Sequence, residues 1–342
     1  MKIGVLSGGG DAPGINAVIR AVVRRGIQSY NDEIIGIRDG WRGLLENAFT
    51  PLNLNAVSGI LPRGGSILGT SRTNPFKREG GPEQIMENAG KAGLEAVIAI
   101  GGDDTLSVAY KMADYRLKCV GVPKTIDNDL SGTDYTFGFN TAVAIATEAL
   151  DRLHSTAEAH NRVMILEVMG RYTGHIALEA GLAGGADVIL IPEKPFDIEE
   201  VCEYIRRRQK RGRNFSLIVV AEGAKPKGGK EIVYSERIDE FGHISLGGVG
   251  YYLAKEIEKC TGIETRVVVL GHIQRGGSPT AYDRILATRF GIAAIDLVHE
   301  GKFGYMVALQ GNKIVSVPLK DVVGKRKTVD LELYNIAKVF FG

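Results

Sequence analysis

The sequence predicts an α/β protein made of two Rossmann-like, three-layer domains with mainly parallel sheets and a site in the cleft between them. Short apolar runs recur along the chain, and each ends in a Gly-rich or acidic turn. Helical patterns follow several of these turns, and strands that alternate with helices are typical of a parallel sheet covered on both faces. A chain of 342 residues is long enough for two domains, at roughly 150 residues per domain.

The repeating unit is a strand, a turn and a helix. The predicted strand Lys2–Ser7 precedes the turn 8–16 and the helix Ala17–Arg25, and the strand Glu95–Ile100 precedes a helix that continues to about Ala113. The other main predicted strands are Lys118–Val122, Val163–Val168, Ser216–Ala221 and Arg266–Leu270. Because ligands bind outside the carboxyl ends of parallel strands, we expect the turns that follow them to converge.

The domain boundaries are harder to place. We expect residues 1–138 to form one domain, rejoined by about 250–300, and residues 139–250 to form the other, with 300–342 as a C-terminal segment. No low-complexity linker occurs, so the two domains should exchange strands or helices. The polar stretch Lys225–Lys230 is typical of a loop or short insertion.

Composition restricts the class of protein. Apolar residues make up 44% and charged residues 24% of the chain, as in ordinary soluble enzymes. The formal charge of +2, from 42 basic minus 40 acidic residues, supports neither a nucleic-acid partner nor a membrane. The three cysteines, Cys119, Cys202 and Cys260, are too sparse to indicate a disulfide framework or a zinc site. With neither a signal-peptide pattern nor a membrane-length apolar run, we expect a cytoplasmic protein.

The turn Gly8–Gly10 precedes a predicted helix, where backbone N–H groups favour an anion and the absence of Cβ atoms permits close approach. It is neither a Walker A loop nor Gly-x-Gly-x-x-Gly, since Pro13 occupies the position of the last glycine. A plain tight turn explains it equally well.

Two acidic turns could bind a metal ion or accept a proton. Asp103 and Asp104 could hold Mg²⁺ against a phosphate, although an ordinary helix N-cap would explain one of them. Thr125–Asp129 could place a carboxylate beside a substrate hydroxyl, and an Asx-turn is the equally weighted alternative. Guanidinium groups bind phosphate bidentately, but each candidate alone is more often a surface residue; the candidates are Arg72, Arg162, Arg171, Arg266 and Arg275.

Taken together, these turns resemble the phosphofructokinase family over the whole chain. The matching segments are Gly9–Asn16, Gly101–Asp103, Thr125–Asp129, Glu167–Arg171 and Gly271–Pro279. The resemblance implies Mg²⁺-dependent phosphorylation of the 1-hydroxyl of fructose 6-phosphate. It also implies that the first domain binds the phosphoryl donor and the second binds the sugar phosphate.

The resemblance also implies roles for particular residues. Asp127 matches the general base, Asp103 the residue that positions Mg²⁺, and Gly10 and Arg72 the contacts to the donor phosphates. Arg162 and Arg266 match arginines that reach a neighbouring subunit's site, which implies a homo-oligomer, most simply a tetramer. The positions that match sugar-phosphate contacts are Thr125, Met169, Gly170, Arg171, Glu222, His272 and Arg275.

Two positions indicate the donor. ATP-using members similar to this chain typically have glycine at position 104 and often at 124, whereas this chain has Asp104 and Lys124. A carboxylate at 104 would crowd and repel the α-phosphate of ATP, and Lys124 would bring a charge to the transferring or departing phosphate. The pair resembles the pyrophosphate-dependent branch, whose reaction we expect to run in both directions.

Two alternatives remain open. The chain could be an ATP-dependent phosphofructokinase that tolerates Asp104, or a silent regulatory subunit or sugar-phosphate sensor, although Asp127, Asp103 and the arginines are all present. Leu54 and His154 replace effector-binding arginines of allosteric relatives, so nucleotide regulation is not expected. The stretch 223–246 is longer than in those relatives, and the sequence assigns it no role.

Overall fold

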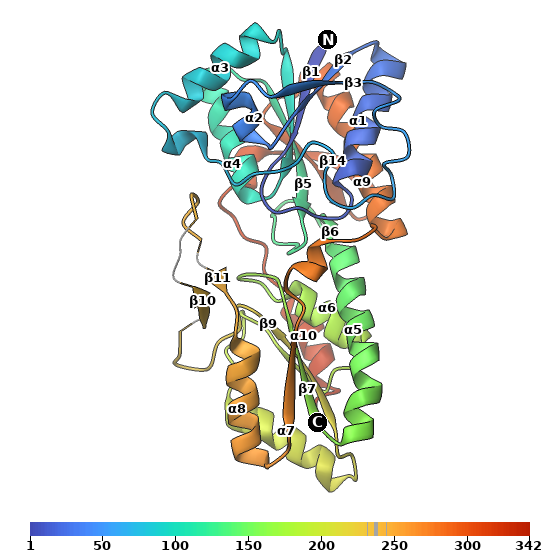
Figure 1. Ribbon diagram of the computed structural model, residues 1–342, viewed down its shortest axis with the longest axis vertical. Coiled ribbons are helices and arrows are strands. Elements are labelled where there is room, and N and C mark those ends of the chain that lie inside the picture. Colours follow the sequence, from blue (N-terminus) through green and yellow to red (C-terminus); the bar gives the residue numbers. More distant parts are fainter. Residues whose placement is uncertain (231, 236–238, 244) are drawn as a thin grey trace.

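The computed structural model describes residues 1–230, 232–235, 239–243 and 245–342. These residues form two α/β domains stacked end to end, each with a mainly parallel sheet between helices (Figure 1). The first sheet has eight strands and the second has four. The predicted fold class is confirmed.

The first sheet has the strand order β14-β13-β5-β4-β1-β2-β3, with β6 paired to β5 off this path. Its pairs are parallel except β2 with β3 and β13 with β14. The strands are β1 Lys2–Ser7, β2 Glu33–Ile37, β3 Phe49–Leu52, β4 Ala96–Gly101, β5 Cys119–Thr125, β6 Phe137–Gly138, β13 Tyr305–Gln310 and β14 Lys313–Pro318.

Both faces of the sheet are buried at its inner strands, which explains why β4 is apolar over its whole length. Along β4, Ile98 and Ile100 belong to the core shared with α1 (Ile15–Tyr30) and α9 (Ala281–His299). Val97 and Ala99 belong to the core on the opposite face. The helices of that second core are α2 Trp41–Leu45, α3 Gly81–Lys91 and α4 Asp103–Lys111.

The second sheet is entirely parallel, in the order β12-β7-β9-β8. Alternate residues of β7 again enter two cores, one with α5, α6 and α10 and the other with α7 and α8. Its strands are β7 Val163–Val168, β8 Val188–Leu190, β9 Ser216–Ala221 and β12 Thr265–Val269. Its helices are α5 Phe139–His160, α6 His175–Ala183, α7 Ile198–Lys210, α8 Val249–Thr261 and α10 Leu331–Lys338.

Short elements complete the described part of the chain. Strands β10 and β11 form a small antiparallel pair between β9 and α8. The ranges are β10 Val233–Ser235 and β11 Ser245–Leu246, with 3₁₀ turns η1 Pro75–Lys77, η2 Met112–Tyr115, η3 Gly271–Arg275 and η4 Leu319–Asp321. No helix of the described residues combines the length and apolar character that crossing a membrane requires.

The chain crosses between the domains more than once, as the absence of a linker predicted. Helix α8 and strand β12 belong to the second domain, whereas α9, β13 and β14 return to the first. The return expected at about 250–300 begins only with α9, and part of the expected C-terminal segment 300–342 belongs to the first domain. The cause is the hairpin 305–318, whose strand β13 pairs with β5 and extends the first sheet.

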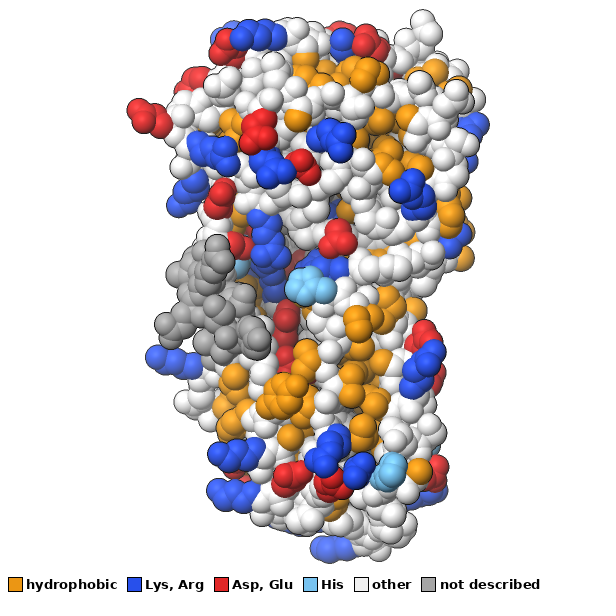
Figure 2. Space-filling view, viewed as in Figure 1, with side chains coloured by type: hydrophobic (Ala, Val, Ile, Leu, Met, Phe, Trp, Pro, Cys, Tyr) orange, Lys and Arg blue, Asp and Glu red, His pale blue; other side chains and the backbone are white. Residues whose placement is uncertain are grey.

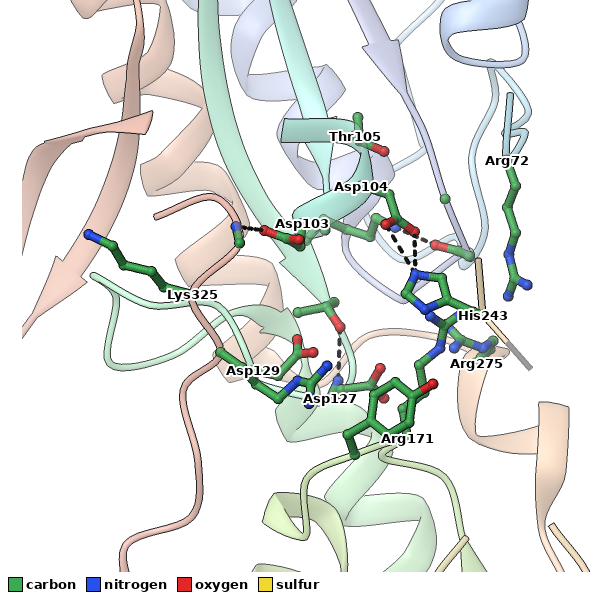
Figure 3. Close-up of a pocket in the computed structure, with 18 residues that line it drawn as sticks. Arg72, Asp103, Asp104, Thr105, Asp127, Asp129, Arg171, His243, Arg275 and Lys325 are labelled. Atoms are coloured by element: carbon green, nitrogen blue, oxygen red, sulfur yellow. Dashed lines mark hydrogen bonds and ion pairs between the residues drawn. The ribbon is translucent and has the colours of Figure 1, made fainter. Parts of the chain in front are cut away.

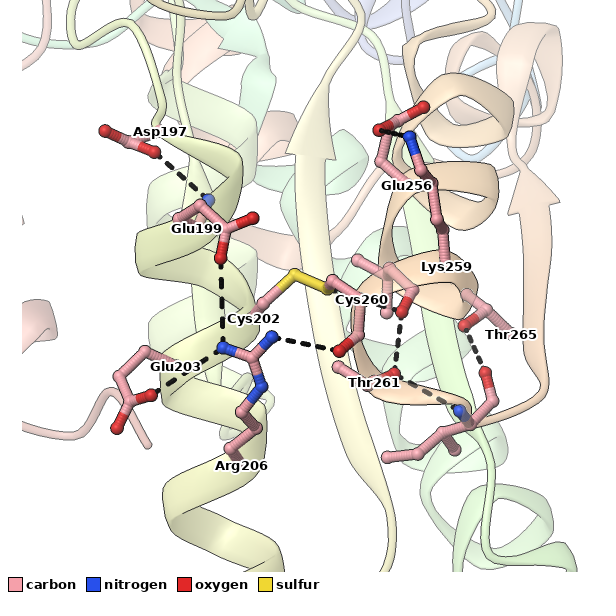
Figure 4. Close-up of a disulfide and its surroundings, with 12 residues drawn as sticks. Asp197, Glu199, Cys202, Glu203, Arg206, Glu256, Lys259, Cys260, Thr261 and Thr265 are labelled. Atoms are coloured by element: carbon pink, nitrogen blue, oxygen red, sulfur yellow. Dashed lines mark hydrogen bonds and ion pairs between the residues drawn. A yellow bond between two sulfur atoms is a disulfide. The ribbon is translucent and has the colours of Figure 1, made fainter.

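The expectation from the cysteine pattern was wrong for one pair. Cys202 in α7 and Cys260 in α8 form a disulfide with their Cα atoms 6.4 Å apart (Figure 4). The two cysteines are 58 residues apart in sequence, but α7 and α8 contribute to the same core of the second domain. Their proximity is therefore a product of tertiary packing, which sequence spacing does not reveal.

Candidate active site

The largest collection of predicted site residues lines one pocket in the cleft between the domains (Figure 3). In the space-filling view, basic, acidic and histidine side chains meet in a hollow at this level (Figure 2). The parallel strands of both sheets point their carboxyl ends at the cleft, so turns distant in sequence converge there. The predicted residues that line the pocket are Gly10, Arg72, Asp103, Asp104, Lys124, Thr125, Asp127, Arg171 and Arg275.

Asp127 lies in the turn that continues β5, fixed beside the fully buried Ile126. Its backbone N–H donates to Thr125 Oγ1 at 3.1 Å. The residue is only 5% exposed, and within the described part of the chain its Oδ1 atom is buried without a hydrogen-bond partner. An unsatisfied buried carboxylate oxygen is costly, so it is expected where a ligand supplies the missing partner. The side chain does not close an Asx-turn, which removes that alternative for Asp127.

The rest of this turn is held from behind by Lys327. Its Nζ donates to Asn128 Oδ1 at 3.0 Å, Thr133 O at 2.9 Å and Asp134 O at 2.7 Å. Its backbone N–H donates to Asp129 O at 2.8 Å. Asn128 has a φ of 52°, in the left-handed region, so these contacts offset a strained backbone at the residue after Asp127.

Asp103 and Asp104 begin α4, but neither is its N-cap. Gly102 occupies that position and makes no side-chain cap. Asp103 Oδ1 accepts from the Gly324 N–H at 2.8 Å, and both Asp104 oxygens lie near His243 Nε2, at 3.1 and 3.2 Å. Burial raises the pKa of Asp103, against the opposing effect of the Gly324 hydrogen bond. Both carboxylates therefore belong to the pocket, and the capping alternative is not what the structure adopts.

Lys124 is a buried cation at the floor of the same pocket. It is 3% exposed, and its Nζ donates to Gly10 O. Burial, helped by the nearby Arg275 charge, lowers the pKa of Lys124 to about 7. The site therefore holds an ammonium group that an anionic ligand would stabilise.

Gly10 makes room for Arg275. A Cβ atom at Gly10 would lie 2.6 Å from Arg275 Nη1, closer than side-chain atoms tolerate. Arg275 is 8% exposed and its Nη1 donates to Asp11 O at 3.2 Å. A glycine at this position therefore lets a buried guanidinium from the second domain reach the backbone of the first.

Met169, Gly170 and Glu222 support the pocket from behind but do not line it. Glu222 Oε1 accepts from the Arg171 N–H at 3.0 Å, and Gln274 Oε1 accepts from the Met169 N–H at 2.7 Å. Burial, with the charge of Asp127 as a second cause, raises the pKa of Glu222 to about 7. These residues hold the turn that places Arg171 in the pocket.

Three predicted residues lie elsewhere on this chain. Arg162 precedes β7 and Arg266 is near the start of β12, at the opposite end of these strands from the cleft. Both arginines pair with Glu264. His272 is exposed and does not line the pocket.

The pocket also contains residues to which the sequence analysis gave no individual role. Asp129, Thr105 and Tyr172 lie inside or beside predicted turns, so proximity in sequence could have indicated them. His243 and the segment 324–326 come from distant parts of the chain and carried no such signal. The additional lining residues are Gly9, Gly102, Thr105, Asp129, Tyr172, His243, Gly324, Lys325 and Arg326.

Comparisons with known proteins place the chain in a family. Residues 2–298 match the family model described as Phosphofructokinase. Over the full length of both chains, the protein is 60% identical to a pyrophosphate–fructose 6-phosphate 1-phosphotransferase of Streptomyces coelicolor. It is 53% identical, again over both full lengths, to an ATP-dependent 6-phosphofructokinase of Mycobacterium tuberculosis. A pyrophosphate-dependent phosphofructokinase from Marinobacter aquaeolei superimposes with a TM-score of 0.84 at 25% identity, covering 97% of this chain and 86% of that one.

Proposed function

The chain belongs to the phosphofructokinase family, and on that premise we propose that it transfers a phosphoryl group reversibly between pyrophosphate and the 1-hydroxyl of fructose 6-phosphate. The observation that carries the proposal is the pairing of two features in one pocket. Asp127 presents a buried, unpartnered oxygen, while Asp104 and Lys124 occupy the donor side.

Asp127 acts as the general base. The sugar's 1-hydroxyl oxygen forms a bond to the terminal phosphorus of pyrophosphate while the bond from that phosphorus to the bridging oxygen breaks. The hydroxyl proton passes to Asp127, and phosphate leaves. The unpartnered Oδ1 of Asp127 is suited to accept from the hydroxyl because no protein donor competes for it.

Lys124, Arg72 and the backbone at Gly10 bind the donor. The ammonium of Lys124 faces the charge that accumulates on the departing phosphate, where a preorganised cation stabilises the transition state. Asp104 excludes the α-phosphate of a nucleotide through repulsion between like charges in a poorly screened pocket. Pyrophosphate has no third phosphate to place there.

Asp103 is the residue that would position Mg²⁺. Mg²⁺ is commonly held by one or two carboxylates together with substrate phosphates and water, and the Asp103 carboxylate in a phosphate-sized pocket fits this pattern. In the described part of the chain, no group of three or more His, Cys, Asp or Glu side chains could hold a metal without a substrate. When bound, Mg²⁺ would neutralise phosphate charge between the donor and Asp103.

The sugar phosphate is bound on the second domain's side of the cleft. Arg171 and Arg275 offer guanidinium groups to its phosphate or hydroxyls, Thr125 borders the reacting end, and Met169, Gly170 and Glu222 keep these groups in place. His272 would contact the bound sugar phosphate from the rim of the cleft. The first domain thus binds the donor and the second binds the acceptor.

Arg162 and Arg266 would complete the site of a neighbouring subunit, which makes the protein a homo-oligomer, most simply a tetramer. Their distance from the cleft of their own chain supports this assignment. Exposed apolar side chains lie close to Arg266 in sequence: Val269 is 42% and Ile273 66% exposed. The protein would be cytoplasmic, with soluble sugar phosphates as substrates.

The experiment is ³¹P NMR of the purified protein with fructose 6-phosphate, pyrophosphate and Mg²⁺. We expect the pyrophosphate signal to decrease while orthophosphate and a sugar 1-phosphate signal grow in equal amounts. Adding fructose 1,6-bisphosphate and phosphate should regenerate pyrophosphate. Consumption of ATP in its place would establish the ATP-dependent alternative, and no transfer from either donor would leave the silent-subunit alternative.

A further inference from the structure

The turn Asp239–His243 belongs to the chain segment between β9 and α8 of the second domain, yet it contacts the donor side of the first. Asp239 Oδ2 lies 3.3 Å from Arg72 Nη1, and Glu240 Oε2 accepts from the Asn74 N–H at 2.8 Å. Phe241 packs against the core beneath α2, α3 and α4. The turn is thus attached to the first domain by an ion pair, a hydrogen bond and an apolar contact.

These attachments present His243 to Asp104. Its Nε2 lies 3.1 Å from one Asp104 oxygen and 3.2 Å from the other, in the wall of the pocket (Figure 3). Asp239 Oδ1 accepts from the backbone N–H groups of Phe241 and His243, each at 3.0 Å, which fixes the turn internally. The imidazole position is therefore determined by the turn and its attachments.

We propose that His243 is a positioning residue that selects the donor by fixing the Asp104 carboxylate. This inference rests on the proposed function. An unpaired carboxylate at 104 could rotate away from the nucleotide position, and its full charge would also repel pyrophosphate. The Nε2–H group bound to Asp104 holds the carboxylate in place and offsets part of that charge. His243 thereby lets one acidic residue exclude ATP without excluding the smaller donor.

The test is a double-mutant cycle of His243→Ala and Asp104→Gly. We expect H243A to raise the KM for pyrophosphate about tenfold, as for a lost hydrogen bond to a charged group, with the KM for fructose 6-phosphate changed by less than about twofold. The ratio of kcat/KM for pyrophosphate to that for ATP should fall. On the D104G background the same substitution should have little effect, because the carboxylate that His243 positions is absent.

Three further variants separate this role from a structural one. H243Q keeps an N–H donor near the Nε2 position and should restore most of the pyrophosphate KM. E240A loosens the turn without touching Asp104 and should change donor selectivity less than H243A does. H299A is the matched control, since His299 Nε2 lies 2.8 Å from Asp32 Oδ2 and neither of these residues lines the pocket. An equal effect of H243A with and without Asp104 would overturn the inference.

Binding measurements distinguish failure of this inference from failure of the proposed function. Trp41 is the only tryptophan of the chain, and its Nε1 donates to Thr105 O at 3.2 Å, next to Asp104. Its fluorescence should therefore respond to pyrophosphate and Mg²⁺ without turnover. If the wild type binds pyrophosphate but does not transfer it, the proposed function is wrong. The role of His243 would then still predict that H243A binds pyrophosphate more weakly than the wild type. If H243A binds pyrophosphate as tightly as the wild type, or the wild type does not bind it, the role of His243 is wrong.

Discussion

The two sides of the pocket are built differently. The turn Thr125–Asp129, which carries the proposed base, directly continues strand β5. Lys327 donates to Asn128 Oδ1 and Asp129 O of this turn, and to Thr133 O and Asp134 O of the loop that follows it. The wall on the donor side, formed by Asp104, Lys124 and His243 and called the donor wall below, depends instead on the turn Asp239–His243 from the other domain. His243 of this turn contacts Asp104, and the turn is attached to the first domain at Arg72 and Asn74. A base on a rigid strand end is suited to chemistry that all donors share. A wall completed by a separate segment is suited to selecting among donors.

Replacing the base should have the largest effect. We expect Asp127→Ser to lower kcat roughly a hundred- to ten-thousand-fold, because the sugar hydroxyl loses its proton acceptor. Binding of fructose 6-phosphate, measured by isothermal titration, should be retained. The rates with pyrophosphate and with ATP should fall by the same factor, because the base acts on the sugar hydroxyl whichever donor is bound. A kcat within a few-fold of wild type would remove Asp127 from the mechanism.

Loosening the catalytic turn should have the next largest effect. Lys327→Met removes one side-chain hydrogen bond to the turn, at Asn128 Oδ1, and two to the loop that follows it, at Thr133 O and Asp134 O, without touching the pocket surface. Since small displacements of a reacting group are costly, we expect kcat to fall about ten- to a hundredfold, with the donor ratio unchanged. A change in the ratio of pyrophosphate to ATP activity would contradict the separation of the two sides.

Changing the donor wall should instead alter the ratio of pyrophosphate to ATP activity. We expect Asp104→Gly to shift the ratio of kcat/KM for pyrophosphate to that for ATP by about tenfold toward ATP, as the like-charge contact disappears. The KM for fructose 6-phosphate should stay within about twofold of wild type. If ATP is still excluded from D104G, the obstruction is steric and lies elsewhere in the pocket.

The smallest predicted effect concerns pH. Burial holds the pKa of Lys124 at about 7, well below its usual value. Above pH 7 the free enzyme therefore loses the ammonium, while bound pyrophosphate favours it, so binding takes up a proton and affinity falls as pH rises. We expect the KM for pyrophosphate to increase about three- to tenfold from pH 7 to pH 8. Lys124→Arg, which stays charged, should show only the donor's own titration, and an identical pH profile would contradict the role of Lys124.

The fold and the convergence of most predicted site residues in one pocket were predictable because both depend on local pattern. Asp127, Asp103 and Lys124 follow apolar strands, and the carboxyl ends of parallel strands meet at one edge. The Asp104–His243 pair was not predictable, because its partners are 139 residues apart and only the tertiary fold joins them. The same holds for the Cys202–Cys260 disulfide and for the hairpin β13–β14, which extends the first sheet after the chain has formed all four strands of the second.

The stretch 223–246 is a second case in which the sequence did not indicate a tertiary contact. Its length was visible in the sequence, but its contribution to the donor wall depends on where residues 239–243 lie. Residues 231, 236–238 and 244 fall outside the described part of the chain, so the assignment of a role is restricted to the turn Asp239–His243.

The most direct test of the account is an aldolase-coupled rate of the wild-type protein with fructose 6-phosphate and Mg²⁺, comparing pyrophosphate with ATP as donor. The structure of the donor wall predicts rapid turnover with pyrophosphate and little with ATP. Turnover with ATP that equals or exceeds turnover with pyrophosphate would contradict the role assigned to Asp104, Lys124 and the wall that they form.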